Sequence, residues 1–112
     1  MAFHATLTID SGIAKITMSG QLDASMAPIF QKEVERAAAQ KVKRLVLLMS
    51  ELEYIASAGL RVLVFTKQKM GPGVDIYVVS AQQQVMDTLQ MTGFDQSIIA
   101  IDTYEAGMIE PM

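Results

Sequence analysis

An uninterrupted apolar run in the middle of the chain constrains the fold more than any other feature. Leu45, Val46, Leu47, Leu48 and Met49 follow one another with no polar residue between them. A strand with one solvated face alternates apolar and polar residues, whereas a strand buried on both faces is apolar throughout. The run therefore predicts a central strand of a mainly parallel sheet.

The segments on either side of this run carry alternating strand and helix patterns. Residues 2–19 contain two alternating segments around Asp10-Ser11-Gly12, which predicts a β-hairpin that Gly20 ends. Apolar residues at helical spacing predict helices over about 26–39, 57–70, 82–91 and 103–108, and further strands are predicted near 74–78 and 98–101. This order predicts one α/β domain over residues 1–112. Its sheet is mixed and mostly parallel, with four to five strands, an N-terminal β-hairpin and about four helices.

Composition and charge exclude several classes of protein. The chain has 112 residues and no cysteine, which excludes disulfides, thiolate metal sites and a thiol nucleophile. Nine scattered basic residues and a net charge of -3 do not suit nucleic-acid binding. No apolar run approaches the ~20 residues of a membrane span, and the N-terminus does not resemble a signal peptide. We therefore expect a cytoplasmic protein without nucleic-acid or membrane partners.

The residues that enzymes use for catalysis are sparse. The only histidine, His4, falls in the first predicted strand, and no second histidine or cysteine accompanies it. A nucleophilic serine would consequently lack a general base. There is also no glycine-rich phosphate loop and no metal-ligand spacing. We expect no enzymatic activity, no cofactor and no bound metal.

The segment after the apolar run carries the most specific signal. Residues 50–56 are predicted to form a loop, and Ser57 is predicted to be the N-cap of the next helix, on which Leu60, Leu63 and Val64 face inward. Gly59 leaves room for close approach to the helix start. A phosphate on Ser57 would meet the positive end of the helix, so the fold would stay intact while a docking surface changed. Spacing alone also fits a plain helix cap at Ser57 and a packing glycine at Gly59.

Three stretches resemble the STAS domain family. Residues 54–60 (Tyr-Ile-Ala-Ser-Ala-Gly-Leu) resemble its signature, in which an acidic residue, a serine and a small or hydroxyl residue precede Gly-Leu. Residues 20–24 (Gly-Gln-Leu-Asp-Ala) resemble the Gly-x-Leu-Asp segment before the first helix, and residues 89–94 (Leu-Gln-Met-Thr-Gly-Phe) resemble the segment that closes the third helix. The matches follow the family's order and cover nearly the whole chain.

The resemblance is to the anti-sigma factor antagonist branch of this bacterial family. It implies that the unphosphorylated protein binds an anti-sigma factor and so frees a sigma factor. The anti-sigma factor is also a serine kinase that phosphorylates the antagonist, and a phosphoprotein phosphatase restores it. By this resemblance Ser57 is the phosphoacceptor, and the partner-binding residues are Asp23, Ala56, Ser57, Ala58, Gly59 and Arg61.

Two residues depart from the family pattern. Ala56 stands where an acidic residue is usual, and Arg61 stands where a small residue is frequent. Arg61 lies one helical turn after Ser57, which suggests that it pairs with a phosphate there. The Ala56 departure keeps an alternative open, a STAS subunit of a transport or other multiprotein complex without a phosphoswitch. Asp23 is likewise open to interpretation as an N-cap of the first helix.

Overall fold

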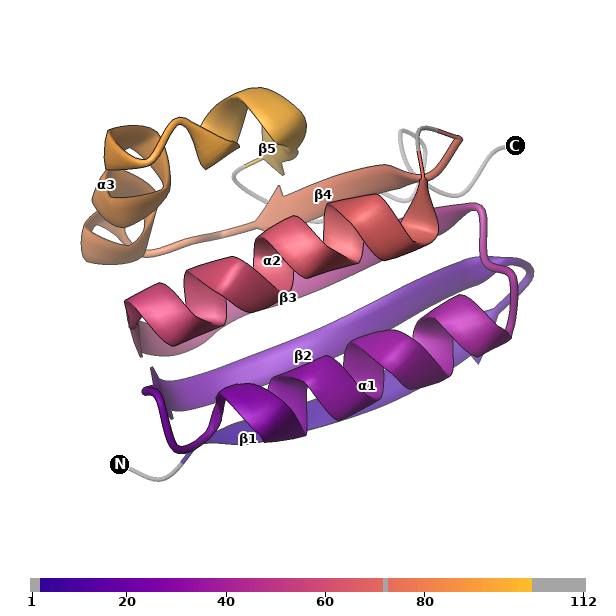
Figure 1. Ribbon diagram of the computed structural model, residues 1–112, viewed down its shortest axis with the longest axis horizontal. Helices are drawn as coiled ribbons and strands as arrows, with labels where there is room; N and C mark the ends of the chain where they lie inside the picture. Colours follow the sequence, from indigo (N-terminus) through magenta and orange to yellow (C-terminus); the bar gives the residue numbers. More distant parts are fainter. Residues whose placement is uncertain (1–2, 72, 102–112) are drawn as a thin grey trace.

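The computed structural model describes residues 3–71 and 73–101 of the chain. Its elements appear in the order predicted from the sequence (Figure 1). They are β1 (His4–Asp10), β2 (Ile13–Leu22), α1 (Ala27–Ala39), β3 (Arg44–Ile55), α2 (Ser57–Met70), β4 (Asp75–Val79), α3 (Gln83–Met91), the 3-10 helix η1 (Phe94–Ser97) and β5 (Ile99–Ile101).

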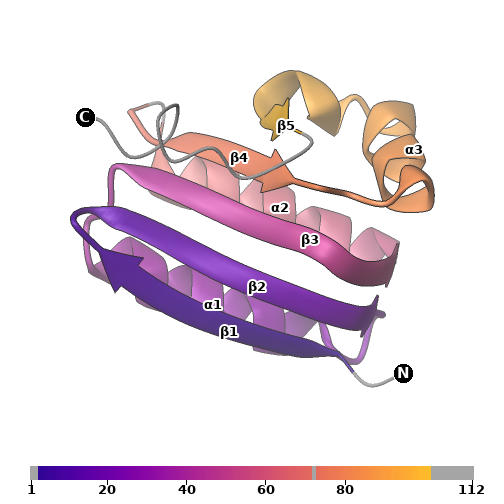
Figure 2. The ribbon, with the colours of Figure 1, turned by 180° about the vertical axis from the view of Figure 1, so that it is seen from behind.

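The five strands form one mixed sheet in the order β1-β2-β3-β4-β5. β1 pairs antiparallel with β2, and each later neighbour pairs in parallel, as Figure 2 shows from behind. This confirms the predicted mostly parallel sheet with an N-terminal hairpin. Three α-helices lie within the described residues, and the fourth, expected over 103–108, falls outside them.

The main core lies between the sheet and the two long helices, α1 and α2, which cover the same face (Figures 1 and 2). Leu45, Leu47 and Met49 of β3 point into it. Val46 points to the opposite face, where it packs with Ile13, Tyr77 and Val79 in a smaller cluster. β3 is therefore buried on both faces, as its apolar run predicts.

The second half of β3 corrects the sequence-based boundaries. Residues 50–55 continue the strand where a loop was predicted, and β2 runs past Gly20 to Leu22. The pairing of β2 with β3 shifts register at two places, and at each of them β3 contains one residue more than β2. Gly20, at the second shift, adopts a φ of 84°. These bulges leave Ser50 and Glu51 exposed. The interrupted alternation explains why this segment resembled a loop.

The inward face of α2 also differs from the prediction. Leu63 is buried as predicted, but Val64 is 45% exposed, and Thr66 faces the core instead. The Thr66 hydroxyl donates to the carbonyl of Val62 at 2.6 Å, which satisfies the buried polar group. Within the described ranges, no helix has the length and apolar character needed to cross a bilayer.

Candidate functional site

The predicted site residues Asp23 and Ser57 both lie at one edge of the sheet. β2 and β3 run parallel and end side by side, with Leu22 paired to Ile55. The backbone N–H of Ala56 donates to the carbonyl of Leu22 at 2.9 Å, which ties the two strand ends together. Asp23, which follows β2, and Ser57, which follows β3, therefore lie at the same carboxyl edge (Figure 1). Parallel sheets characteristically place their binding surfaces at this edge.

Ser57 is the first residue of α2, and its side chain is exposed. The N-cap is Ala56, with φ -86° and ψ 168° and no side-chain capping bond, so the predicted N-cap role of Ser57 is wrong. The reason is the extended β3, which runs to Ile55 and leaves Ala56 as the only connecting residue. The Ser57 hydroxyl is consequently not used to cap the helix.

This geometry predicts that Ser57→Ala changes the free energy of unfolding by less than about 0.5 kcal/mol, because removing a true N-cap typically costs ~1 kcal/mol. Urea denaturation of both proteins measures the difference. Thr66→Ala, which removes a buried hydroxyl from the same helix, is the control and should cost more than about 1 kcal/mol. A loss of 1 kcal/mol or more for Ser57→Ala would contradict the assignment of Ala56 as the cap.

Gly59 is buried beneath the start of α2 and faces the core. A Cβ atom at this position would lie 2.9 Å from Cγ and Cδ2 of Leu22 and 3.0 Å from Cγ1 of Ile55. The close approach that the sequence predicted is thus made by the protein's own strand ends. Gly59 lies below the surface that Ser57 occupies, and its place among the partner-binding residues stays a prediction.

Asp23 is exposed and organises the turn between β2 and α1. Its carboxylate accepts bonds from the Ser25 hydroxyl at 2.7 Å and from the Met26 N–H at 3.1 Å. The Ser25 bond, helped by the backbone N–H groups, holds the pKa of Asp23 below its ordinary value. Met26 is the formal N-cap of α1, so Asp23 is not the cap itself. It presents a fixed negative charge at the edge that carries Ser57.

The other predicted site residues near Ser57 differ in their exposure to solvent. Ala56 and Ala58 are half-buried, and Arg61 is exposed one turn further along α2. Tyr54, which was not among the predicted partner-binding residues, is 50% exposed near the end of β3. Tyr54 is the first residue of the signature segment 54–60, and its aromatic side chain could have indicated a contact. We call the exposed Asp23, Tyr54, Ser57 and Arg61, with Ala56 and Ala58 between them, the Ser57 surface.

A second contact fixes the strand beside this surface. Gln82 donates its side-chain amide to the carbonyl of Ser50 at 3.0 Å, and Gln84 of α3 donates to the carbonyl of Glu53. These bonds connect α3 to the bulged part of β3, whose backbone groups are not fully paired with β2. The strand end that leads to Ser57 is therefore held from both sides.

The chemistry available at the Ser57 surface is limited. His4 is on β1, and no cluster of three or more histidines and carboxylates suited to a metal is found over residues 3–71 and 73–101. A hydroxyl at the first position of a helix can, however, carry a phosphate close to N–H groups that have no acceptor within the helix. The arrangement suits a modification site on a binding surface.

Comparison with known proteins gives similar sequences and folds. Anti-sigma-F factor antagonist RsfB of Mycobacterium tuberculosis is 24% identical over 98 residues, which cover 88% of this chain and 80% of that protein. The structure of an anti-sigma factor antagonist from Mycobacterium paratuberculosis superposes with a TM-score of 0.85 at 22% identity, covering 96% and 92% of the two chains.

SpoIIAA, an anti-sigma factor antagonist, has the same fold in two solved forms. Its unphosphorylated form has a TM-score of 0.78 at 16% identity, with 96% of this chain and 92% of that chain covered. Its phosphorylated form, described as a Bacillus cell fate determinant, has a TM-score of 0.72 at 16% identity and 97% coverage of both chains. The STAS domain family model matches residues 4–107 of the present chain. The chain therefore belongs to the STAS domain family.

Proposed function

We propose that this protein is an anti-sigma factor antagonist whose binding is switched by phosphorylation of Ser57. Unmodified, it binds a kinase-type anti-sigma factor through the Ser57 surface and frees a sigma factor. The observation that carries the proposal is the exposed Ser57 hydroxyl, unused in capping, at the sheet edge that also presents Asp23. The similarity to RsfB, named an anti-sigma-F factor antagonist, supports the choice of partner.

A phosphate on Ser57 acts on the partner and leaves the scaffold unchanged. It adds about -1.5 to -2 charges beside the free N–H groups of the first turn of α2. Asp23 already places a carboxylate at this edge, so a docked partner would have to desolvate two negative groups. Burying an unpaired charge in an interface costs several kcal/mol, and about 1.4 kcal/mol lowers affinity tenfold. A phosphatase that removes the group restores binding.

Incubation with ATP and the kinase-type anti-sigma factor of the same organism tests this proposal. Mass spectrometry of the products should place a single phosphate on Ser57, and Ser57→Ala should remain unmodified. Phosphate at another residue, or none with an active kinase, would refute the switch. The protein itself is proposed to be a non-enzymatic, cytoplasmic binding module, so it should not hydrolyse ATP in the absence of the kinase.

Arg61 is proposed to stabilise the phosphorylated state. It is exposed one turn after Ser57 and makes no ion pair with another described residue. A charge-assisted pair at this spacing contributes about 0.5 kcal/mol. We expect Arg61→Ala to speed dephosphorylation of the phosphoprotein about twofold. Lys69→Ala, at the other end of α2, should leave this rate unchanged, and equal rates for all three proteins would contradict the pairing.

One observation favours a second candidate function, a STAS subunit of a multiprotein complex without a phosphoswitch. Ala56 occupies the position where the family pattern has an acidic residue, directly before the acceptor serine. A kinase that reads this acidic residue would not recognise the chain. Stable association with a transport complex, unaffected by ATP and kinase, would identify this function.

A further inference from the structure

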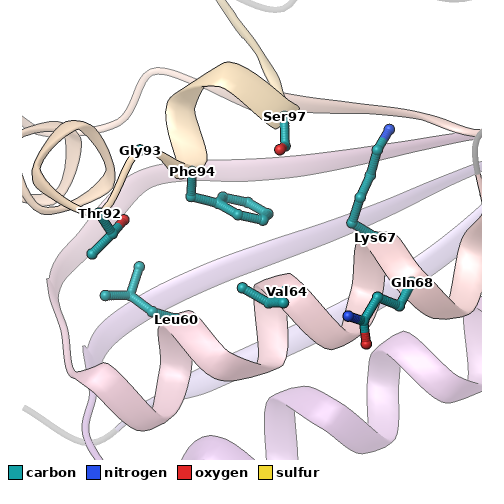
Figure 3. A pocket seen from close by; sticks show the side chains of 8 residues that line it. All are labelled: Leu60, Val64, Lys67, Gln68, Thr92, Gly93, Phe94 and Ser97. Atoms are coloured by element: carbon teal, nitrogen blue, oxygen red, sulfur yellow. The ribbon is translucent and has the colours of Figure 1, made fainter.

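A groove of about 380 Å³ separates α2 from η1 and begins at Leu60, one helical turn after Ser57. Figure 3 shows its side chains in two facing rows, with Leu60, Val64 and Lys67 on α2 and Phe94 and Ser97 on η1. Its volume falls within the range of about 300–1,000 Å³ that small-molecule sites occupy. The groove therefore has room for a small ligand.

The middle of the groove is apolar although it is open to solvent. Val64 is 45% exposed, while the Phe94 ring and the half-buried Leu60 lie beside it (Figure 3). The nearby Thr92 hydroxyl donates to carbonyls at the end of α3, at 3.0 Å to Leu89 and 3.2 Å to Thr88. The Thr92 hydroxyl therefore already hydrogen-bonds the C-terminal end of α3. A bound aliphatic chain would cover the exposed apolar surface of Val64 beside the largely buried Phe94 ring.

One end of the groove is polar and positively charged. The Lys67 ammonium makes only a long bond of 3.5 Å, to the carbonyl of Val74, and so keeps donors for another acceptor. The Ser97 hydroxyl has no hydrogen-bond partner among the residues that the structure describes. Lys67 and Ser97 lie at the same end in Figure 3, opposite Leu60 and Thr92. None of the described lining residues carries a carboxylate that would neutralise Lys67.

We propose that this groove binds a linear aliphatic monocarboxylate. The aliphatic tail lies along Leu60, Val64 and Phe94, and the carboxylate accepts hydrogen bonds from the Lys67 ammonium and the Ser97 hydroxyl. The charge selects the ligand class because Lys67 is the single cation among the described lining residues. A monoanion is neutralised by it, whereas a dianion would keep one unpaired charge in a partly apolar site. This site is separate from the Ser57 surface and does not depend on the proposed switch.

Octanoate is a suitable probe, followed by 15N-HSQC spectra of the full chain. The amide signals of Val64, Lys67 and Phe94 should shift saturably, with a dissociation constant of roughly 1 mM or tighter. Octanamide, which is neutral, and octylammonium, which is positive, should bind at least about fivefold more weakly. Affinity should rise from hexanoate to octanoate by at most about fourfold per methylene, because a buried methylene contributes ~0.8 kcal/mol.

Two pairs of matched variants locate the ligand. Lys67→Gln should weaken octanoate about fivefold or more and leave octanamide unchanged, whereas Lys69→Gln on the same helix should do neither. Val64→Ser should weaken both ligands, while Ile29→Ser, which alters an equally exposed residue of α1, should weaken neither. Thermal unfolding verifies that each variant is folded.

Three outcomes would overturn the proposal. Octanoate could fail to shift the groove signals, octanamide could bind as tightly as octanoate, or Lys67→Gln could leave octanoate binding intact. If octanoate leaves the groove signals unchanged but an anti-sigma factor shifts them, the groove would instead bind a side chain of that partner. None of these results depends on whether Ser57 is phosphorylated.

Discussion

Ser57→Asp is expected to weaken binding to the kinase-type anti-sigma factor about tenfold or more, because a carboxylate at this exposed helix start must be desolvated when the partner docks. Ser57→Ala should bind like the unmodified protein and become insensitive to ATP, since the hydroxyl does not cap α2. Isothermal titration with the purified anti-sigma factor measures both effects. The carboxylate imitates a phosphate only in part, so the loss for Ser57→Asp is a lower limit.

A serine at the other end of the molecule provides the control for this experiment. Ser11 is exposed in the β1–β2 turn, far from the start of α2 in Figure 1, and its φ of 53° suits an aspartate. Ser11→Asp adds the same charge to the protein without touching the Ser57 surface, and it should not change the affinity. Equal losses of affinity for Ser57→Asp and Ser11→Asp would show that the effect comes from the net charge of the protein. No loss for Ser57→Asp would contradict docking at this helix start.

Gly59→Val is expected to destabilise the fold by about 2–3 kcal/mol, because its first side-chain carbon meets Leu22 and Ile55 at 2.9–3.0 Å. Leu22 and Ile55 are themselves buried, so neither can turn outward to make room. Gly59→Ala should cost less, since alanine gains about 1 kcal/mol of helix propensity over glycine. Urea denaturation monitored by circular dichroism gives the free energies of unfolding.

Gly73 offers a matched control for the substitution of Gly59. It is exposed, and a Cβ atom there would have nothing within 4 Å. Gly73→Ala should therefore change stability by less than about 0.5 kcal/mol. If Gly59→Val were equally mild, the tight packing of α2 on the strand ends would be wrong. If Gly59→Val is destabilising as expected, a loss of partner binding by Gly59→Val would result from displacement of the start of α2. It would not show that Gly59 itself contacts the partner.

Strong periodic patterns explain why most of the architecture could be predicted from the sequence. The run Leu45–Met49 identified a strand buried on both faces, and Val46 and Leu47 do point into different clusters. The β1–β2 turn lies where it was predicted, and the helices α1, α2 and α3 lie within one residue or so of their predicted positions, because apolar spacing and turn residues mark their ends. Local rules decide these features, and nothing distant overrides them.

α2 begins at Ser57 as predicted, but the segment before it and its cap residue were mispredicted because distant pairing decides them. Residues 50–56 were predicted to form a loop, but β2 supplies a partner strand, and bulges absorb the mismatch so that Leu52 and Ile55 are buried. This extension moves the cap to Ala56 and brings Leu22 under Gly59. The groove beside Phe94 was also not predicted, since η1 follows α3 with no periodic pattern of its own.

The most direct test of the switch compares the protein carrying a genuine phosphate on Ser57 with the unmodified protein. Titration of each into the kinase-type anti-sigma factor should show an affinity about a hundredfold or more lower for the phosphoprotein, since a dianion is desolvated at the interface. Phosphatase treatment should restore the original affinity. Equal affinities for the phosphorylated and unmodified proteins would contradict the account.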